Sequence, residues 1–136
     1  MAVVQIEAVD RSTALNECEG TLTGRLDGDL FTCHVLDPEA EWSRYRIGES
    51  IDVDVWLERT GELSVLPTGT PPEIRQIEGC VYELTGVVVE REGQDAEVQA
   101  TRRFRVDLDL TPFEDLPDVQ VGDTVRLRAM LQAELG

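Results

Sequence analysis

The sequence predicts an all-β protein, a compact barrel or sandwich built from two repeated, similar halves with short helical turns. Short segments alternate between apolar and polar residues, and turns rich in glycine and proline separate them. No long stretch has the periodicity of a helix. The sequence pattern of the strand that begins with Gly48-Glu49 also recurs 74 residues later, where it begins with Gly122-Asp123.

The first repeat is predicted to span residues 1–67. Its expected strands are Val3–Val9, 20–26, 30–36, 48–57 and Leu63–Leu66. Asp27-Gly28-Asp29 predicts a tight hairpin, because these residue types favour two-residue turns between strands. Asp37 and Pro38 suit the cap and first residue of a short helical turn.

The second repeat is predicted to span residues 73–136, with strands at 79–90, 97–110 and 122–131. In the middle strand Phe104, Val106 and Leu108 share one face, which is therefore expected to be the buried one. A second helical turn is expected from Thr111, with Glu114 completing a capping box and Pro117 ending the turn. The joint, residues 68–72, is short, so the two repeats are expected to form one compact unit.

Further motifs recur between the two repeats. Cys18 to Gly24 matches Cys80 to Gly86 at an offset of 62 residues, whereas Phe31 matches Phe104 at an offset of 73. An insertion of 11 residues accounts for the difference, and the stretch 91–97 is interpreted as a longer hairpin tip.

The order of strands, short helix and closing strand resembles OB-fold and related small barrel domains. The resemblance is carried by Thr85-Gly86-Val87-Val88, by the strand from Phe104 to Leu108, and by Gly122 to Leu127. It implies, at the level of the fold, a partly open barrel.

The chain of 136 residues is strongly acidic, with 28 acidic and 12 basic residues and a net charge of −16. This is either a uniformly solvated acidic surface or a surface that steers toward a basic partner. Both interpretations disfavour binding to nucleic acid, which needs clustered cations. No apolar run has the length of a membrane span and the N-terminus does not resemble a secretory signal, so a cytoplasmic location without membrane contact is expected.

Several kinds of chemistry lack their residues. The chain has no lysine for a P-loop or a Schiff base, and His34 is its one histidine. Cys18, Cys33 and Cys80 follow no metal spacing and are expected to be reduced. His34 is expected to be exposed on a polar face. We therefore predict no catalytic residue, no metal and no cofactor.

The carboxylates Asp52 and Asp54 share one face of their strand, and the equivalent places in the second repeat hold Arg126 and Arg128. Charge pairing across strands explains this pattern better than a metal or acid–base site does.

Trp56 lies off the apolar face of its strand, as does its counterpart Met130. The tryptophan is either covered by the other repeat or exposed as an anchor for a partner. The predicted partner-binding residues are Trp56, Trp42, Tyr45, Asp52, Asp54 and Glu58.

The sequence thus predicts a non-enzymatic acidic β-domain that acts as a protein–protein binding module. In its sharpest form, the hypothesis is a neutralising partner of a basic protein, similar to an immunity protein or antitoxin. The alternative is an OB-like domain that binds nucleic acid or a small ligand, for which Arg44 and Arg46 form the only basic spot near aromatic residues. An enzyme that uses a carboxylate pair is the third hypothesis.

Overall fold

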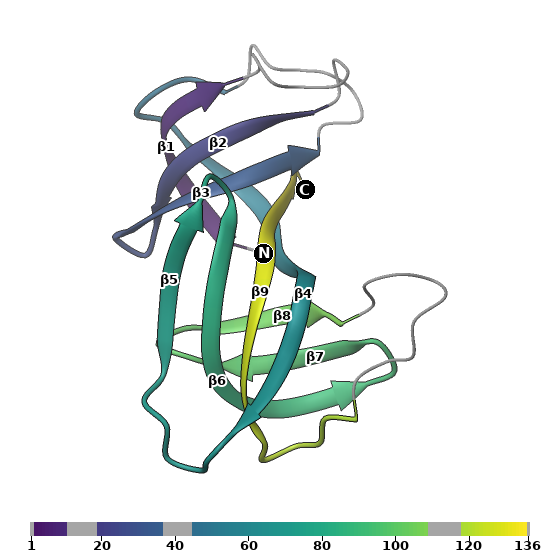
Figure 1. Ribbon diagram of the computed structural model, residues 1–136. Coiled ribbons are helices and arrows are strands. Elements are labelled where there is room, and N and C mark those ends of the chain that lie inside the picture. The colour runs from purple at the N-terminus through teal and green to yellow at the C-terminus, as the bar shows by residue number, and fades with distance from the viewer. Residues whose placement is uncertain (1, 11–18, 37–44, 109–117, 136) are drawn as a thin grey trace. The chain divides into compact units, whose positions relative to one another are not determined.

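The computed structural model describes residues 2–10, 19–36, 45–108 and 118–135 (Figure 1). These residues form nine strands and contain no helix, which confirms the all-β class. The strands are β1 (Ala2–Asp10), β2 (Glu19–Leu26), β3 (Asp29–Leu36), β4 (Ser50–Leu66), β5 (Glu73–Glu78), β6 (Val81–Glu92), β7 (Asp95–Gln99), β8 (Arg103–Asp107) and β9 (Thr124–Leu135). The helical turns predicted at Asp37 and Thr111 lie outside the described residues.

Neighbouring strands form two closed circuits, and both pass through the β9–β4 pair. One circuit runs β1-β2-β3-β9-β4 and returns to β1. The other runs β9-β4-β8-β7-β6 and returns to β9, and β5 extends the sheet from β6. This ring-like closure is compatible with the barrel alternative.

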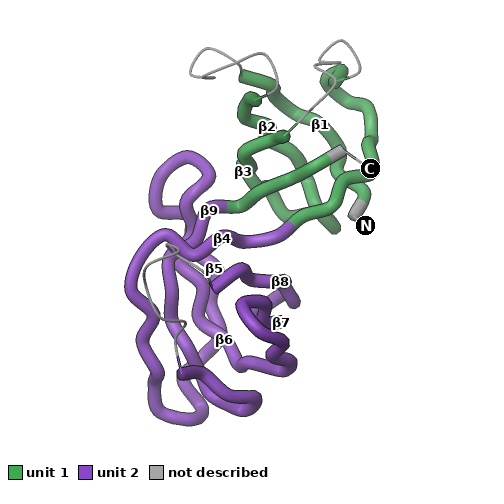
Figure 2. Tube along the Cα trace, turned by 90° about the vertical axis from the view of Figure 1, so that its right-hand side faces the viewer, with its two compact units in different colours: residues 1–55, 131–136 green, residues 56–130 purple. Residues whose placement is uncertain are grey.

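The chain packs as two compact units, which Figure 2 distinguishes by colour. Unit 1 contains residues 1–55 and 131–136, and unit 2 contains residues 56–130. The boundaries therefore fall inside β4 and inside β9. These boundaries do not coincide with those of the predicted repeats, 1–67 and 73–136. The duplication of the two repeats stays a prediction.

Alternating residues of the strands fill the interior of each unit. In unit 1 the buried side chains include Val4, Ile6, Leu22, Leu26, Cys33, Val35, Val53, Leu131 and Ala133. In unit 2 they include Leu57, Tyr82, Leu84, Val88, Val98, Phe104, Val106, Leu108, Leu127 and Ala129. The face predicted to be buried in the stretch 103–108 is therefore confirmed.

The predicted turns are present where glycine signals them. Asp27 and Gly28 have φ values of 51° and 88°, as a two-residue hairpin between β2 and β3 requires. Gly48 and Gly122 have φ values of 88° and 99°, each two residues before a strand begins. The predicted Gly-acid turns therefore both lead into strands.

Three predicted strand boundaries were wrong. β4 is one continuous strand of 17 residues, where two separate strands were expected. The stretch 97–110 includes parts of two strands, because Ala100 N–H donates to the carbonyl of Arg102 at 3.0 Å and reverses the chain. The expected long tip at 91–97 is a tight turn at Gly93-Gln94, since Glu92 pairs directly with Asp95.

Strand β5 was not predicted at all. Its side chains are largely exposed, and its only described pairing is with β6. A strand at the edge of a sheet needs no apolar alternation, which explains why the sequence pattern does not reveal it.

No helix among the described residues has the length and apolar character needed to cross a membrane. A cytoplasmic location stays a prediction.

Candidate interaction face

An acidic row of side chains crosses the outer face of unit 2. The row consists of Glu92 on β6, Asp95 on β7, Asp107 on β8 and Glu58 on β4. Glu92 pairs with Asp95, Asp95 pairs with Asp107, and Asp107 pairs with Glu58 in the ladders of the sheet. Paired residues project on the same side of a sheet, so the four carboxylates are neighbours.

A second row, the tryptophan row, lies beside the acidic row. It consists of Glu90, Glu97, Arg105 and Trp56, each two residues away from a member of the acidic row on the same strand. Residues two apart on a strand share a face, so both rows belong to one surface. The guanidinium carbon of Arg105 lies 5.4 Å from the centroid of the Trp56 ring, within the range of a cation–π contact.

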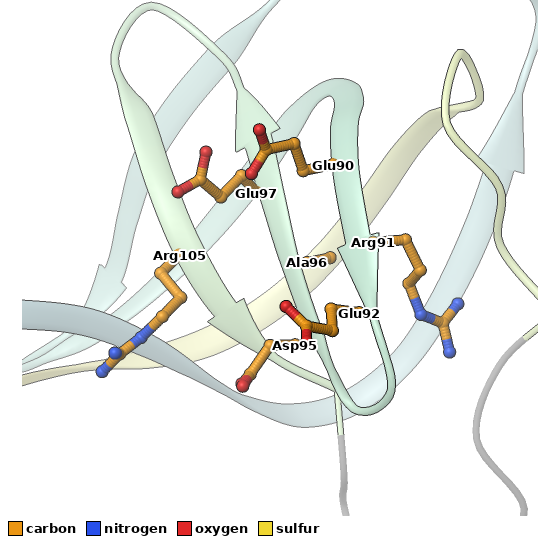
Figure 3. Close-up of a pocket in the computed structure, with 7 residues that line it drawn as sticks. All are labelled: Glu90, Arg91, Glu92, Asp95, Ala96, Glu97 and Arg105. Carbon is orange, nitrogen blue, oxygen red and sulfur yellow. The ribbon is translucent and has the colours of Figure 1, made fainter.

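A cavity of about 170 Å³ opens between members of the two rows on β6, β7 and β8. Figure 3 shows the carboxylates of Glu90 and Glu97 at one end of the cavity and those of Glu92 and Asp95 at the other. Arg91 points away from them (Figure 3), because its guanidinium donates to the carbonyls of Gly93 at 2.9 Å and Val119 at 2.7 Å.

The charged side chains are arranged differently in the two rows. In the tryptophan row Glu90 faces Glu97, and Arg103 lies between them, with Nε 2.6 Å from Glu97 Oε2 and Nη2 3.7 Å from Glu90 Oε1. The acidic row instead consists of three successive pairs of like charge, and Gln94 donates to Asp107 at 3.3 Å. Like charges placed opposite each other destabilise a sheet.

The described parts of the chain contain no group of three or more histidine, cysteine, aspartate or glutamate residues that could hold a metal ion. Of the cysteines, Cys33 is buried and Cys80 is half-buried, both as free thiols, while Cys18 lies outside the described residues. Burial raises the pKa of the Cys80 thiol above its usual 9.0.

The structure brings together two of the predicted partner-binding residues. Trp56 is half-buried in unit 2, and its Nε1 donates to Glu58 Oε1 at 3.4 Å. Asp52 and Asp54 are exposed on β4 but belong to unit 1. Tyr45 also belongs to unit 1, and only 7% of it is exposed, which leaves little of its ring for a partner. Trp42 lies outside the described residues.

The prediction of an exposed His34 was wrong. The ring is half-buried, and its Nδ1 lies 2.6 Å from Oε1 of Gln132, a buried side chain of β9. Arg128 lies across the strands from Glu83, with its Nε 3.5 Å from Glu83 Oε2, whereas charge pairing of Asp52 and Asp54 stays a prediction. Arg126 instead donates to Thr85 Oγ1 at 3.3 Å.

Sequence reasoning missed most of the two rows. Glu92 and Asp95 fall within the stretch 91–97, which the sequence predicts as a hairpin tip, and Arg105 and Asp107 alternate with the buried residues of their strand. Their charges are visible in the sequence, but the pairings of β6, β7, β8 and β4 that align them are not.

No protein-family model, curated protein or solved structure matches this chain.

Proposed function

We propose that the protein is a non-enzymatic binding module that recognises a basic partner protein through the outer face of unit 2. The observation that carries this proposal is the acidic row beside Trp56. The row places four carboxylates side by side on one face, where they can accept ion pairs from the cations of a partner.

The tryptophan row supports the same proposal. Trp56 is a large, partly exposed ring, and Arg105 and Glu58 hold it in place. Tryptophan and arginine are the residue types that contribute most where protein interfaces are well packed. Trp56 then supplies the anchor, while the carboxylates accelerate association and select for a basic surface.

The most specific form of the proposal is a neutralising partner, similar to an immunity protein or antitoxin, that acts in the cytoplasm. The net charge of −16 favours encounter with a basic protein from every side, and the face of unit 2 supplies the contact.

A second candidate function is OB-like ligand binding, which the order of the strands favours. The first circuit runs β1-β2-β3-β9-β4, and its β3 and β9 are parallel. When the five strands of that circuit are numbered in chain order, their order around the circuit is 1-2-3-5-4. This is the order of an OB-fold barrel, whose second and third strands form the ligand face. In unit 2, β7 and β8 carry part of the candidate face, with Asp95, Glu97, Arg105 and Asp107. Carboxylates there repel phosphates, so a nucleic-acid ligand is the weaker candidate.

A matched pair of charge variants tests the main proposal. The first variant carries Glu58→Gln, Glu92→Gln, Asp95→Asn and Asp107→Asn. The control variant carries Asp10→Asn, Asp29→Asn, Glu49→Gln and Glu134→Gln, four exposed positions of unit 1. Both variants remove four negative charges, so long-range attraction to a cationic probe falls equally.

The probe is a synthetic peptide of alternating arginine and glycine, with Trp56 fluorescence as readout in a Trp42→Phe background. We expect the first variant to bind about tenfold more weakly than the control and with a flatter salt dependence. Equal weakening in the two variants would refute the assigned face.

Substitution of the anchor separates its contribution from that of the charges. Trp56→Ala should accelerate dissociation of the probe, followed by surface plasmon resonance, with little change in salt dependence. Single-stranded DNA serves as the contrasting probe, and we expect no binding at physiological salt. Salt-sensitive DNA binding that vanishes with Arg44→Ala and Arg46→Ala would favour the OB-like alternative instead.

A further inference from the structure

The same backbone contacts occur in both units at positions far apart in the chain. In unit 1, Ile6 N–H donates to the Glu49 carbonyl and the Ile6 carbonyl accepts from Gly48, both at 2.8 Å. In unit 2, Val88 makes the same two contacts with Asp123 and Gly122, at 2.9 and 2.8 Å. Strand β1 therefore corresponds to β6, and the first segment of β4 to the first segment of β9.

An irregularity of the sheet occurs at the same place in both units. The register of β1 against β2 shifts between Ile6 and Ala8, and that of β6 against β7 shifts between Val88 and Glu90. Bulges are specific features of a strand pair, so β2 corresponds to β7. The motif match at an offset of 62 residues, which aligned β2 with β6, is therefore not the structural one.

The parallel pairs complete the correspondence. In unit 1, β3 pairs with the end of β9 through His34 and Gln132. In unit 2, β8 pairs with β4 through Asp107 and Glu58. Each unit thus takes its last strand segment from the half of the chain that builds the other unit.

We propose that the two halves of the chain, 1–67 and 73–136, are strand-exchanged repeats. The first half contributes four strand segments to unit 1 and its final segment to unit 2. The second half contributes five segments, β5 included, to unit 2 and its final segment to unit 1, so neither half closes its circuit alone. The binding partner of each half is the other half, and the connection through residues 67–72 only keeps the two together. The alternative is a pair of sequential repeats, each of which closes on itself.

Two leucines of β9 distinguish these alternatives. Leu127 and Leu131 are four residues apart, each is 1% exposed, and the first belongs to unit 2 and the second to unit 1. Replacing either leucine by alanine creates a cavity of the same kind, which makes the two variants a matched pair. Val53→Ala and Leu57→Ala form the corresponding pair on β4, with Val53 in unit 1 and Leu57 in unit 2.

Amide hydrogen exchange reports which strands each variant loosens. We expect Leu131→Ala to accelerate exchange in β1, β2 and β3 by on the order of tenfold or more, and Leu127→Ala to do so in β6, β7 and β8. Faster exchange confined to β6, β7 and β8 in both variants would establish sequential repeats. An equal rise in all strands would contradict the assignment of the two β9 segments to separate units.

Cutting the chain between the halves provides a second measurement. A protease site inserted after Gly69 lies in an exposed connection, where the Thr70 N–H bonds to the Pro67 carbonyl at 3.2 Å. We expect the two pieces to remain associated after cleavage in native mass spectrometry. After separation in denaturant, protected amides should return only when the pieces are mixed. The uncut insertion variant is the control, and two pieces that each refold alone would overturn the proposal.

Discussion

The two units have the same pattern of strand pairing but carry different side chains along it. In unit 2 the ladder aligns the acidic row of four carboxylates. In unit 1 the equivalent ladder aligns Asp10 with Thr21, Thr21 with His34 and His34 with Gln132, so only one acid is present. Strand pairing determines which side chains are neighbours, while the side chains themselves differ, from four carboxylates in unit 2 to one carboxylate and the buried Gln132 in unit 1.

The interiors of the two units also differ. The difference lies at the residue that follows Gln132 on β9 and at the residue that follows Glu58 on β4. In unit 1 the position after Gln132 is Ala133, which is fully buried. In unit 2 the position after Glu58 is Arg59, which is 6% exposed and donates from Nε to the Leu108 carbonyl at 2.8 Å. Unit 2 thus contains a buried charge with backbone acceptors where unit 1 contains a methyl group.

The largest expected effect comes from a glycine that allows two strands to approach closely. A Cβ at Gly86 would lie 2.5 Å from the Gln99 carbonyl oxygen, and one at Gly24 would lie 2.6 Å from that of Gln5. We expect Gly86→Ala to destabilise the protein by about 3 kcal/mol and to lower Tm by about 10 °C, measured by calorimetry. Gly61→Ala is the control, because no atom lies within 4 Å of its added Cβ. A Gly86→Ala melting temperature equal to that of the control would show that the strands separate without cost.

The second effect tests the buried arginine of unit 2. Arg59→Met should destabilise the protein by about 2 kcal/mol, because the carbonyls of Leu108 and Gly61 lose a donor. Urea unfolding measures this as a lower midpoint at constant slope. Arg25→Met is the matched control, since Arg25 makes an exposed ion pair with Glu7 at 2.7 Å and its loss should cost less than about 1 kcal/mol. Equal effects would mean that burial of Arg59 contributes nothing.

The third prediction concerns like-charge pairs, whose removal in unit 2 should raise stability and whose introduction in unit 1 should lower it. Asp95→Asn removes two like-charge pairs and should stabilise unit 2 by about 0.5 kcal/mol, with a larger gain at low salt. Thr21→Asp at the equivalent place of unit 1 creates a like-charge pair with Asp10 and should destabilise the protein by a similar amount. Thermal melts of both variants at low and high salt measure the difference. A lower Tm for Asp95→Asn would disprove repulsion within the acidic row.

The smallest effect concerns the thiols, studied in a Cys18→Ser background. Because burial raises the Cys80 pKa in the folded protein, the fold favours the neutral thiol. That stabilisation is complete below pH 9.0 and is lost as the pH rises through the folded pKa. A disulfide reagent should therefore label Cys80 more slowly than an unfolded thiol at neutral pH, and buried Cys33 only after unfolding. Rapid labelling of both cysteines in the native protein would contradict these placements.

The sequence by itself determined the local features of the protein. The alternation around Phe104 predicted a buried strand face, and Asp27-Gly28 predicted a hairpin turn with positive φ angles. Both follow from the covalent structure of a short segment, because strand side chains alternate and only a few residue types adopt positive φ.

Only the tertiary structure decided which strands lie side by side. Backbone hydrogen bonds are the same for every sequence, so alternation shows which residues face inward but not which strand is the neighbour. For this reason the sequence predicts an exposed His34, whereas the ring contacts Gln132, 98 residues away. The acidic row depends on the same decision, because its four carboxylates come from four strands and only strand pairing makes them neighbours.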